Sequence, residues 1–270
     1  MTFLHLLLVD AYGNRIQATV PDKLLSSFLH LLRDGVAYTI SSIASVPNVG
    51  RYRWTPHLCA LSFMPVTQVI VEECSVIPNH SFSFGSIDSV FMPFFSSDIL
   101  RDVIGLLTTV TEEISYVKDE ISTPAIMLEL SDQYGTMDCC LFGEHVLQLH
   151  QFLAVNSAIQ TVVVVQLCRM HLCDGRIVVH ALPGVSNIMF NPDIYEASQL
   201  KSRMFEHGFF DTIPSMVGSG RRTSVEDQFM CSYPRITLEQ LSHVNEVDCC
   251  HQCYAGWNLY CPWNNCWTEL

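Results

Sequence analysis

Hydrophobic and polar residues follow one arrangement that occurs twice along the chain. Each copy has an apolar run that ends at an Asp, then Tyr-Gly, a second strand-like run and a segment with helical spacing. The two phrases lie at residues 8–13 and 130–135. Alternating runs joined by a turn predict a β-hairpin, and apolar residues three or four apart predict a helix. The pattern therefore predicts a duplicated small domain in which a hairpin leads into a helix.

The first copy predicts a short series of strands within residues 1–70. Its hairpin turn falls at Tyr12, Gly13 and Asn14, and Asp22 is positioned to cap the helix that follows. The expected elements are strands at residues 4–9, 15–20, 36–46 and 58–63 and a helix at 23–32.

The second copy, within residues 101–206, repeats this plan with one more strand at its start. The expected strands lie at residues 103–117, 125–130, 137–141, 158–170 and 177–181, with a helix at 144–152. Asp174 and Gly175 form the turn between the last two strands. Five strands with a helix between the third and the fourth is the order of an OB-fold, a five-stranded Greek-key barrel. The chain is therefore predicted to be mainly β, with OB-folds in tandem.

The segments outside the two modules differ in composition. Residues 71–100 contain prolines, serines and several phenylalanines, and we expect them to connect the domains. Residues 207–270 begin with a Gly- and Ser-containing linker and end in a Cys-rich tail. A chain of 270 residues has room for two ordinary domains and such a tail.

Charge is unevenly distributed along the chain, whose formal net charge is −13. Residues 1–70 carry five basic and three acidic residues, a balance of +2, whereas residues 86–206 carry six basic and fifteen acidic residues, a balance of −9. If the protein meets a phosphate backbone, the first module is favoured and the second is handicapped.

The cysteines suggest a reducing compartment and one candidate metal site. Five of the twelve lie within residues 249–266, and the N-terminal apolar run has no basic flank of the kind that a signal peptide has. A Cys-x-x-Cys pair bends two thiolates around tetrahedral zinc, and two further cysteines could complete the site. The candidate Zn²⁺ ligands are Cys250, Cys253, Cys261 and Cys266. The alternative is a remnant that binds nothing or binds zinc weakly, because the loop between the pairs is short.

Two function classes are not expected. The sequence contains no phosphate-binding loop that ends in Lys-Ser/Thr, no Gly-x-Ser-x-Gly elbow and no His-Glu-x-x-His, so we expect no enzyme activity. No uninterrupted apolar stretch approaches the length that spans a membrane, so we expect no membrane partner.

Two stretches resemble a known family. Residues 8–20 with 38–41, and residues 128–142 with Asn191-Pro192-Asp193-Ile194, are similar to the two tandem DNA-binding domains of the large subunit of replication protein A in its plant-type form. The chain resembles a version truncated at both ends. Its first OB-fold lacks the opening strand because residue 4 already belongs to the second strand. The third domain, which carries the family's zinc ribbon and trimerisation surface, is reduced to a short Cys-rich remnant.

The resemblance implies a nuclear protein that binds single-stranded DNA in replication, repair or recombination, with other replication protein A subunits as further partners. Such OB-folds stack bases on aromatic side chains and meet phosphates with basic ones. Phe142 matches one stacking position and Tyr52 another, whereas Pro21 replaces a third, and the fourth has only His171 nearby. The residues expected to contact phosphates are Arg15, Lys23, Arg51, Arg53, Arg169 and Arg176.

Each of these residues also has an interpretation that involves no DNA binding. Phe142 is either a stacking platform or a residue that plugs the barrel under its helix, and the segment around Tyr52 is either a binding hairpin or an exposed loop with incidental charge. The rival function is that of a degenerate paralogue which works as a protein-interaction module without appreciable DNA binding. The acidic second domain and the missing aromatics favour that rival, and the electrostatics of the two grooves distinguish the hypotheses.

Overall fold

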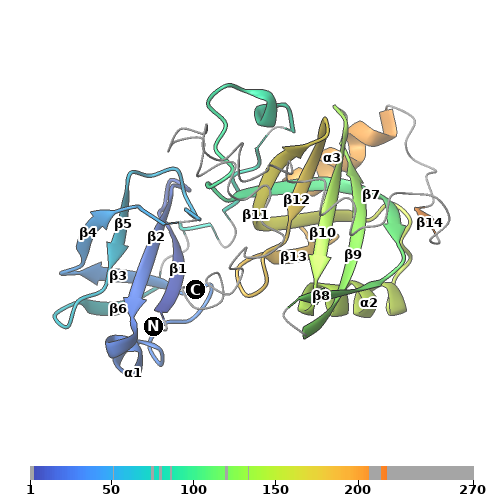
Figure 1. Cartoon of the computed structure of the whole chain (residues 1–270). Helices are drawn as coiled ribbons and strands as arrows, with labels where there is room; N and C mark the ends of the chain where they lie inside the picture. The colour runs from blue at the N-terminus through green and yellow to red at the C-terminus, as the bar shows by residue number, and fades with distance from the viewer. Residues whose placement is uncertain are drawn as a thin grey trace. The chain divides into compact units, whose positions relative to one another are not determined.

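The computed structural model describes residues 3–206 and 214–217, apart from residues 51, 74–75, 79–80, 86, 119–120 and 133. The chain divides into two compact units with the boundary between Phe82 and Ser83. We call them unit 1 and unit 2. Both are built mainly from strands, and the boundary lies within the segment expected to connect two domains (Figure 1).

The strands of unit 1 form two separate ladders. The first has the order β1-β2-β5-β4, and the second pairs β3 with β6. A 3-10 turn at Asp22–Leu24 and the short helix α1 (Leu25–Phe28) follow β2. The strands are β1 (Phe3–Val9), β2 (Arg15–Pro21), β3 (Ala37–Ser41), β4 (Ala44–Pro47), β5 (Cys59–Ser62) and β6 (Gln68–Glu72).

Two local expectations for unit 1 were wrong. The helix is shorter than residues 23–32 and is not capped by the Asp22 side chain. Its single turn buries Phe28 against Phe63, with the ring centroids 5.0 Å apart. The strand expected at residues 36–46 is broken at Ser42, whose φ is +54°. Ala18, Val20, Phe28 and Phe63 form the small buried core.

Unit 2 contains a closed five-stranded barrel, as predicted. The strand order is β7-β9-β10-β12-β11, and β11 pairs again with β7 to close the ring. The strands are β7 (Arg101–Thr111), β9 (Ile121–Ser131), β10 (Thr136–Phe142), β11 (Val162–Cys173) and β12 (Arg176–His180). The helix α2 (Glu144–Val155) lies between the third and fourth strands and contributes Val146 and Leu149 to the barrel core.

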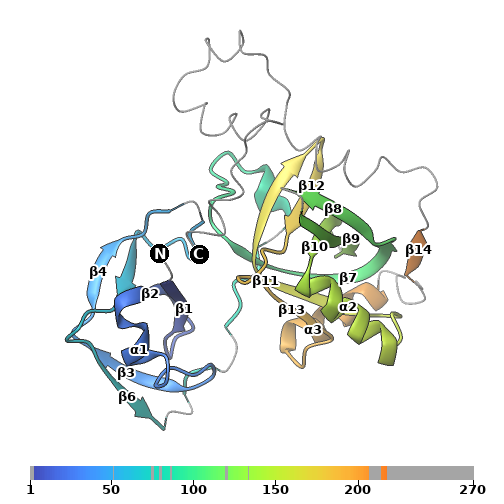
Figure 2. The ribbon, with the colours of Figure 1, turned by 60° about the horizontal axis from the view of Figure 1, so that its bottom comes forward.

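Further elements surround the barrel. The strand predicted at residues 103–117 is interrupted at Glu112 and Glu113, and β8 then continues antiparallel along β9 in the same direction as β7. The helix α3 was not predicted, although Ile194, Ala197 and Leu200 have helical spacing; it packs on β7 and β11 (Figure 2). These elements are η2 (Ile87–Phe91), β8 (Ile114–Lys118), β13 (Asn187–Phe190), α3 (Tyr195–Glu206) and β14 (Ser215–Val217).

The repeated Asp-x-Tyr-Gly phrase forms the same kind of turn in both units. In unit 1, Asp10 Oδ1 accepts the backbone N–H groups of Tyr12 at 2.9 Å and Asn14 at 2.8 Å. In unit 2, Asp132 Oδ1 accepts those of Tyr134 at 2.7 Å and Gly135 at 3.0 Å. An Asp side chain that bonds its own backbone two residues on stabilises a turn. The predicted duplication is therefore confirmed at the level of the hairpins.

A second shared feature was not visible in the sequence. The fourth strand of each barrel plan bends at a residue with φ of +54°, which is Ser42 between β3 and β4 in unit 1 and Leu167 within β11 in unit 2. The hydroxyl of Thr67 donates to Ser42 O at 2.9 Å, and the hydroxyl of Ser186 donates to Leu167 O at 2.9 Å. Each hydroxyl also accepts a backbone N–H from its own loop at 2.8 Å. The bend in the fourth strand is thus held by the same polar contact in both units.

Gly105 of β7 is required by close packing in the barrel. A Cβ atom at this position would lie 2.8 Å from Leu130 Cβ, which is not the flexible end of a side chain. We expect Gly105→Ala to lower the free energy of unfolding of unit 2 by about 1–3 kcal/mol through overpacking. Chemical denaturation measures this change. Gly135→Ala is the matched control, because a Cβ there meets nothing within 4 Å; equal losses in both variants would contradict the packing argument.

Candidate nucleic-acid interface

The outer face of the β1-β2 hairpin in unit 1 carries a row of aromatic rings. Leu4, Leu6 and Leu8 pack on the core, so alternation turns Phe3 and His5 to the opposite face. The His5 ring lies 6.2 Å from the Phe3 ring and 5.5 Å from the Trp54 ring, measured between centroids. We call Phe3, His5 and Trp54 the aromatic row.

The loop between β4 and β5 brings Trp54 to this face. The Trp54 backbone N–H donates to Gln17 Oε1 on β2 at 3.1 Å. Within the loop, Asn48 Nδ2 donates to the backbone oxygens of Thr55 at 3.1 Å and His57 at 2.8 Å. Asn48 and Trp54 are both buried. The loop is therefore held by side-chain contacts in the conformation that packs the Trp54 ring against His5.

The residues of unit 1 that were predicted to bind DNA lie in different surroundings. Tyr52 and Arg53 are half-buried in the same loop as Trp54, and Lys23 is exposed on the 3-10 turn after β2. Arg15 is buried, and its Nη1 donates to Ser81 O at 3.2 Å, so its guanidinium is occupied by the protein's own backbone. Arg51 lies outside the described residues.

His5 is a neutral member of the aromatic row. Its Nδ1 lies 3.1 Å from Thr19 Oγ1 on the neighbouring strand. Burial lowers the pKa of His5 below its usual value, because a charged imidazole would lose its hydration. At neutral pH His5 therefore offers a ring face rather than a positive charge.

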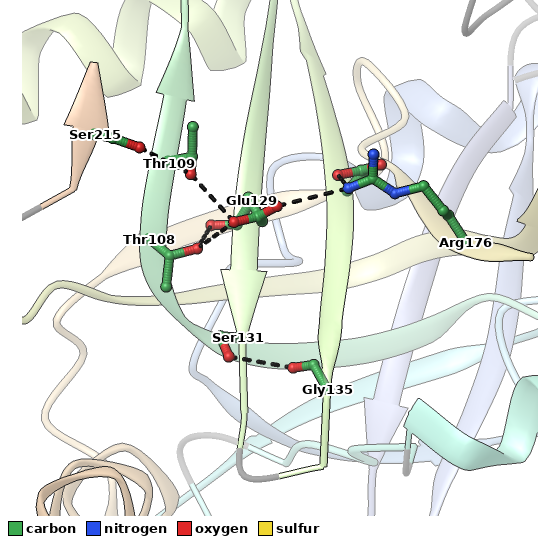
Figure 3. Close-up of polar contacts among 8 residues, drawn as sticks. Thr108, Thr109, Glu129, Ser131, Gly135, Arg176 and Ser215 are labelled. Atoms are coloured by element: carbon green, nitrogen blue, oxygen red, sulfur yellow. Dashed lines mark hydrogen bonds and ion pairs between the residues drawn. The ribbon is translucent and has the colours of Figure 1, made fainter. Parts of the chain in front are cut away.

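Arg176 in unit 2 is committed to two carboxylates (Figure 3). Its Nη2 donates to Asp138 Oδ1 at 2.9 Å and lies 3.6 Å from Glu129 Oε2. The hydroxyls of Thr108 and Thr109 donate to Glu129 Oε1 at 3.0 and 3.1 Å, which fixes the acid in place. The two acids offset the charge of Arg176 at this part of the sheet, and the site is not positive as a phosphate contact requires.

A stacked histidine pair occupies the neighbouring strands of unit 2. The rings of His171 on β11 and His180 on β12 lie 4.9 Å apart with an interplanar angle of 11°. Burial, assisted by the positive charge of Arg169, lowers the pKa of His171 to about 4. Burial also lowers the pKa of His180 well below its usual value, as do His171 and Arg169. Arg169 therefore lies beside two histidines that are neutral at pH 7.

Phe142 is the last residue of β10 and is half-buried. Its ring meets the Tyr116 ring of β8 edge-on, with centroids 5.9 Å apart and an interplanar angle of 67°. Phe142 is outside the main core cluster, to which Leu141 belongs. This placement favours a stacking platform over a barrel plug.

Residues at corresponding positions of the two hairpins make side-chain contacts in both units. Gln17 on β2 and Asp138 on β10 both follow the hairpin turn. Gln17 binds Trp54 in the loop between β4 and β5, and Asp138 binds Arg176, the first residue of β12. In unit 1 the contact places an aromatic ring on the sheet, whereas in unit 2 it forms an ion pair. The sequence analysis missed Phe3 and His5, whereas Trp54 lies in the candidate segment around Tyr52; the alternation of Phe3 and His5 on the outer side of β1 was the available signal.

The metal prediction falls on residues that the structure does not describe. Cys250, Cys253, Cys261 and Cys266 all lie outside the described ranges. Among the residues that are described, no group of three or more His, Cys, Asp or Glu side chains is arranged to hold a metal ion. The described helices include none that is long and apolar enough to cross a membrane.

Comparison with known proteins supports the fold. The model of a family described as a domain of unknown function, DUF223, matches residues 2–92. No curated protein matches the chain. A structure of a replication protein A heterotrimer bound to single-stranded DNA is similar with a TM-score of 0.51 and 19% identity, over 89% of this chain and 54% of that one. This chain thus spans about half of the length of that structure.

Two further solved structures are similar over shorter segments. The OB domain of a protein from Thermoplasma acidophilum is 18% identical, with a TM-score of 0.27 over 35% of this chain and 78% of that one. A replication factor A related protein from Methanobacterium thermoautotrophicum is 13% identical, with a TM-score of 0.28 over 33% of this chain and 77% of that one. The chain is an OB-fold protein that is similar in fold to replication protein A.

Proposed function

We propose that this protein binds single-stranded DNA, without enzymatic activity, through the outer face of unit 1. The aromatic row carries this proposal, because Phe3 and His5 are partly accessible on the hairpin face that OB-folds use for oligonucleotides, and the buried Trp54 ring packs against His5. Half-buried Tyr52 and Arg53 lie in the same loop as Trp54 and supply a further ring and a positive charge. A solved replication protein A heterotrimer that is similar in fold is described as bound to single-stranded DNA, which supports the proposal.

Base stacking on such rings is insensitive to sequence, since every base has a π-face. We therefore infer a general single-strand binder rather than a sequence-specific one. Its proposed setting is the nucleus, in DNA replication, repair or recombination, together with other replication protein A subunits. The cysteines at 250, 253, 261 and 266 remain the predicted zinc ligands.

Unit 2 contributes less to this proposed function. The ion pairs of Arg176 with Asp138 and Glu129 offset its charge, and residues 86–206 have a charge balance of −9. The same observation supports the second candidate function, in which unit 2 binds a protein partner. The two functions are compatible, because they use different units.

A salt titration of oligo(dT) binding tests the proposal. With three to five phosphate contacts, log affinity should fall with log salt concentration at a slope of about −2 to −3.5, since each contact to a single strand contributes about −0.7. Saturable binding with such a slope supports the proposal. No binding at low salt would leave protein interaction as the better function.

Neutralising the acids beside Arg176 should convert unit 2 into a better DNA-binding surface. We expect Glu129→Gln with Asp138→Asn to raise oligo(dT) affinity several-fold and to steepen the salt slope by about 0.7, because Arg176 becomes available to one phosphate. Fluorescence anisotropy at several salt concentrations measures both quantities. Glu112→Gln with Glu196→Gln makes the same change in net charge at exposed positions. An equal gain in this control would show a general charge effect.

A further inference from the structure

The two ladders of unit 1 correspond to strands that are joined in unit 2. The strand β1 matches β9, since both precede the repeated Asp turn, and β3 matches the first half of β11, since both precede the residue with φ of +54°. In unit 2 a single strand, β7, pairs antiparallel with both β9 and β11. Within the described part of unit 1, no strand occupies the place between β1 and β3.

The matching strands of the two units differ in burial, because β7 covers them only in unit 2. In unit 2, residues 162–165 of β11 are each 0% exposed, and six of the seven residues at 125–131 of β9 are buried. The matching residues 37–40 of β3 and all seven residues of β1 are half-buried or exposed. Leu4, Leu6 and Leu8 pack on the core of unit 1 but remain partly accessible. The apolar interior of unit 1 is therefore incompletely covered along the line between β1 and β3.

The strand β7 defines the chemistry of a segment that fits this place. Its side chains Val103 and Leu107 point into the barrel core and are 1% and 0% exposed. Between them, Gly105 crosses Leu130 so closely that a Cβ atom would lie 2.8 Å from Leu130 Cβ. Leu8 is the counterpart of Leu130, because each lies two residues before the Asp of its turn. A fitting segment is extended, has apolar residues at alternate positions and has a small residue where it crosses Leu8.

We propose that unit 1 binds an extended segment of a separate polypeptide, which adds as a strand between β1 and β3 and completes the barrel. Among the described strands, none pairs with the β1 and β3 edges that border this place, so their backbone N–H and C=O groups provide hydrogen bonds, and the uncovered core takes the alternate apolar side chains. The added strand runs antiparallel to both edges, as β7 does in unit 2. This binding surface is separate from the outer face proposed for DNA and does not depend on that proposal.

A peptide with the sequence of β7, Arg101–Thr111, is the probe. Added to the full chain, it should bind with a stoichiometry of one and increase the hydrogen-exchange protection of amides at residues 6–9 and 37–40. Protection at residues 125–131 and 162–165 should not change, because β7 already pairs there. A peptide with Gly105→Leu should bind about tenfold more weakly or worse, since it clashes with Leu8. A peptide with the same composition and scrambled alternation should not bind.

Three outcomes would overturn the proposal. Equal protection of β1, β3 and their unit 2 counterparts in the free monomer would show that the chain itself fills this place. Protection that rises together with dimer formation, measured by analytical ultracentrifugation, would assign the place to a second copy of the chain. Equal affinity for the three peptides would show that the contact lacks the geometry of an added strand.

Discussion

Replacing Tyr52 by alanine should weaken the binding of oligo(dT) by about tenfold to a hundredfold. This range corresponds to the loss of one base stack, worth about 1–3 kcal/mol. Tyr52 is half-buried in the loop whose Trp54 backbone is bound to Gln17 on β2. Fluorescence anisotropy with a labelled oligonucleotide at fixed salt concentration measures the change. The salt slope should stay the same, since tyrosine carries no charge.

Tyr12 provides the matched control for this substitution. It lies at the tip of the β1-β2 hairpin in the same unit and is 91% exposed. Tyr12→Ala removes the same ring without touching the loop, and we expect unchanged affinity. Arg51→Ala with Arg53→Ala should instead flatten the salt slope by about 1 to 1.5, the loss of two phosphate contacts. If Tyr12→Ala weakens binding as much as Tyr52→Ala, the assignment of the outer face is wrong.

Mild acid should destabilise unit 2 through its stacked histidines. The pKa of His171 is about 4 in the folded protein, against 6.5 in an unfolded chain, and that of His180 is also strongly lowered. Between pH 6.5 and 4 the unfolded state therefore binds more protons than the folded state. The contribution of the pair to the free energy of unfolding is fully present above pH 6.5 and is lost as the pH falls toward 4. The shift of His171 alone corresponds to about 3 kcal/mol. The melting temperature measured between pH 7 and pH 4 reports this loss.

Replacing both histidines by phenylalanine distinguishes their contribution to the acid sensitivity from that of the carboxyl groups. His171→Phe with His180→Phe preserves two stacked rings without a titrating nitrogen, and we expect a flatter dependence of melting temperature on pH. The control is His150→Phe on α2, where the imidazole is 50% exposed and lies 2.7 Å from Glu113 Oε2. That variant should still show the fall in melting temperature between pH 7 and pH 4. An unchanged pH profile in the double variant would contradict the role of the buried pair.

The sequence pattern was sufficient to predict the elements that are stabilised by residues close to one another in the chain. The Asp-x-Tyr-Gly phrase predicts both hairpins because the Asp side chain bonds the backbone of its own turn. Alternation and apolar spacing predict the strands of the closed barrel and the helix α2, which ends three residues beyond its expected limit. Element ends and breaks were less predictable. Ser42 interrupts a strand pattern of partial alternation, and the Thr67 hydroxyl, 25 residues away, binds its carbonyl oxygen.

The candidate interface depended on contacts between distant parts of the chain. The sequence by itself determined the duplicated strand order, the turn chemistry and the uneven distribution of charge, since each follows from neighbouring residues. Only the tertiary structure placed Trp54 on His5 and Gln17, and only it placed Asp138 and Glu129 beside Arg176. The physical reason is that ring stacking and charge compensation act over a few ångströms of space. Residues that are 37 positions apart, such as Gln17 and Trp54, come within that range only after the strands have paired.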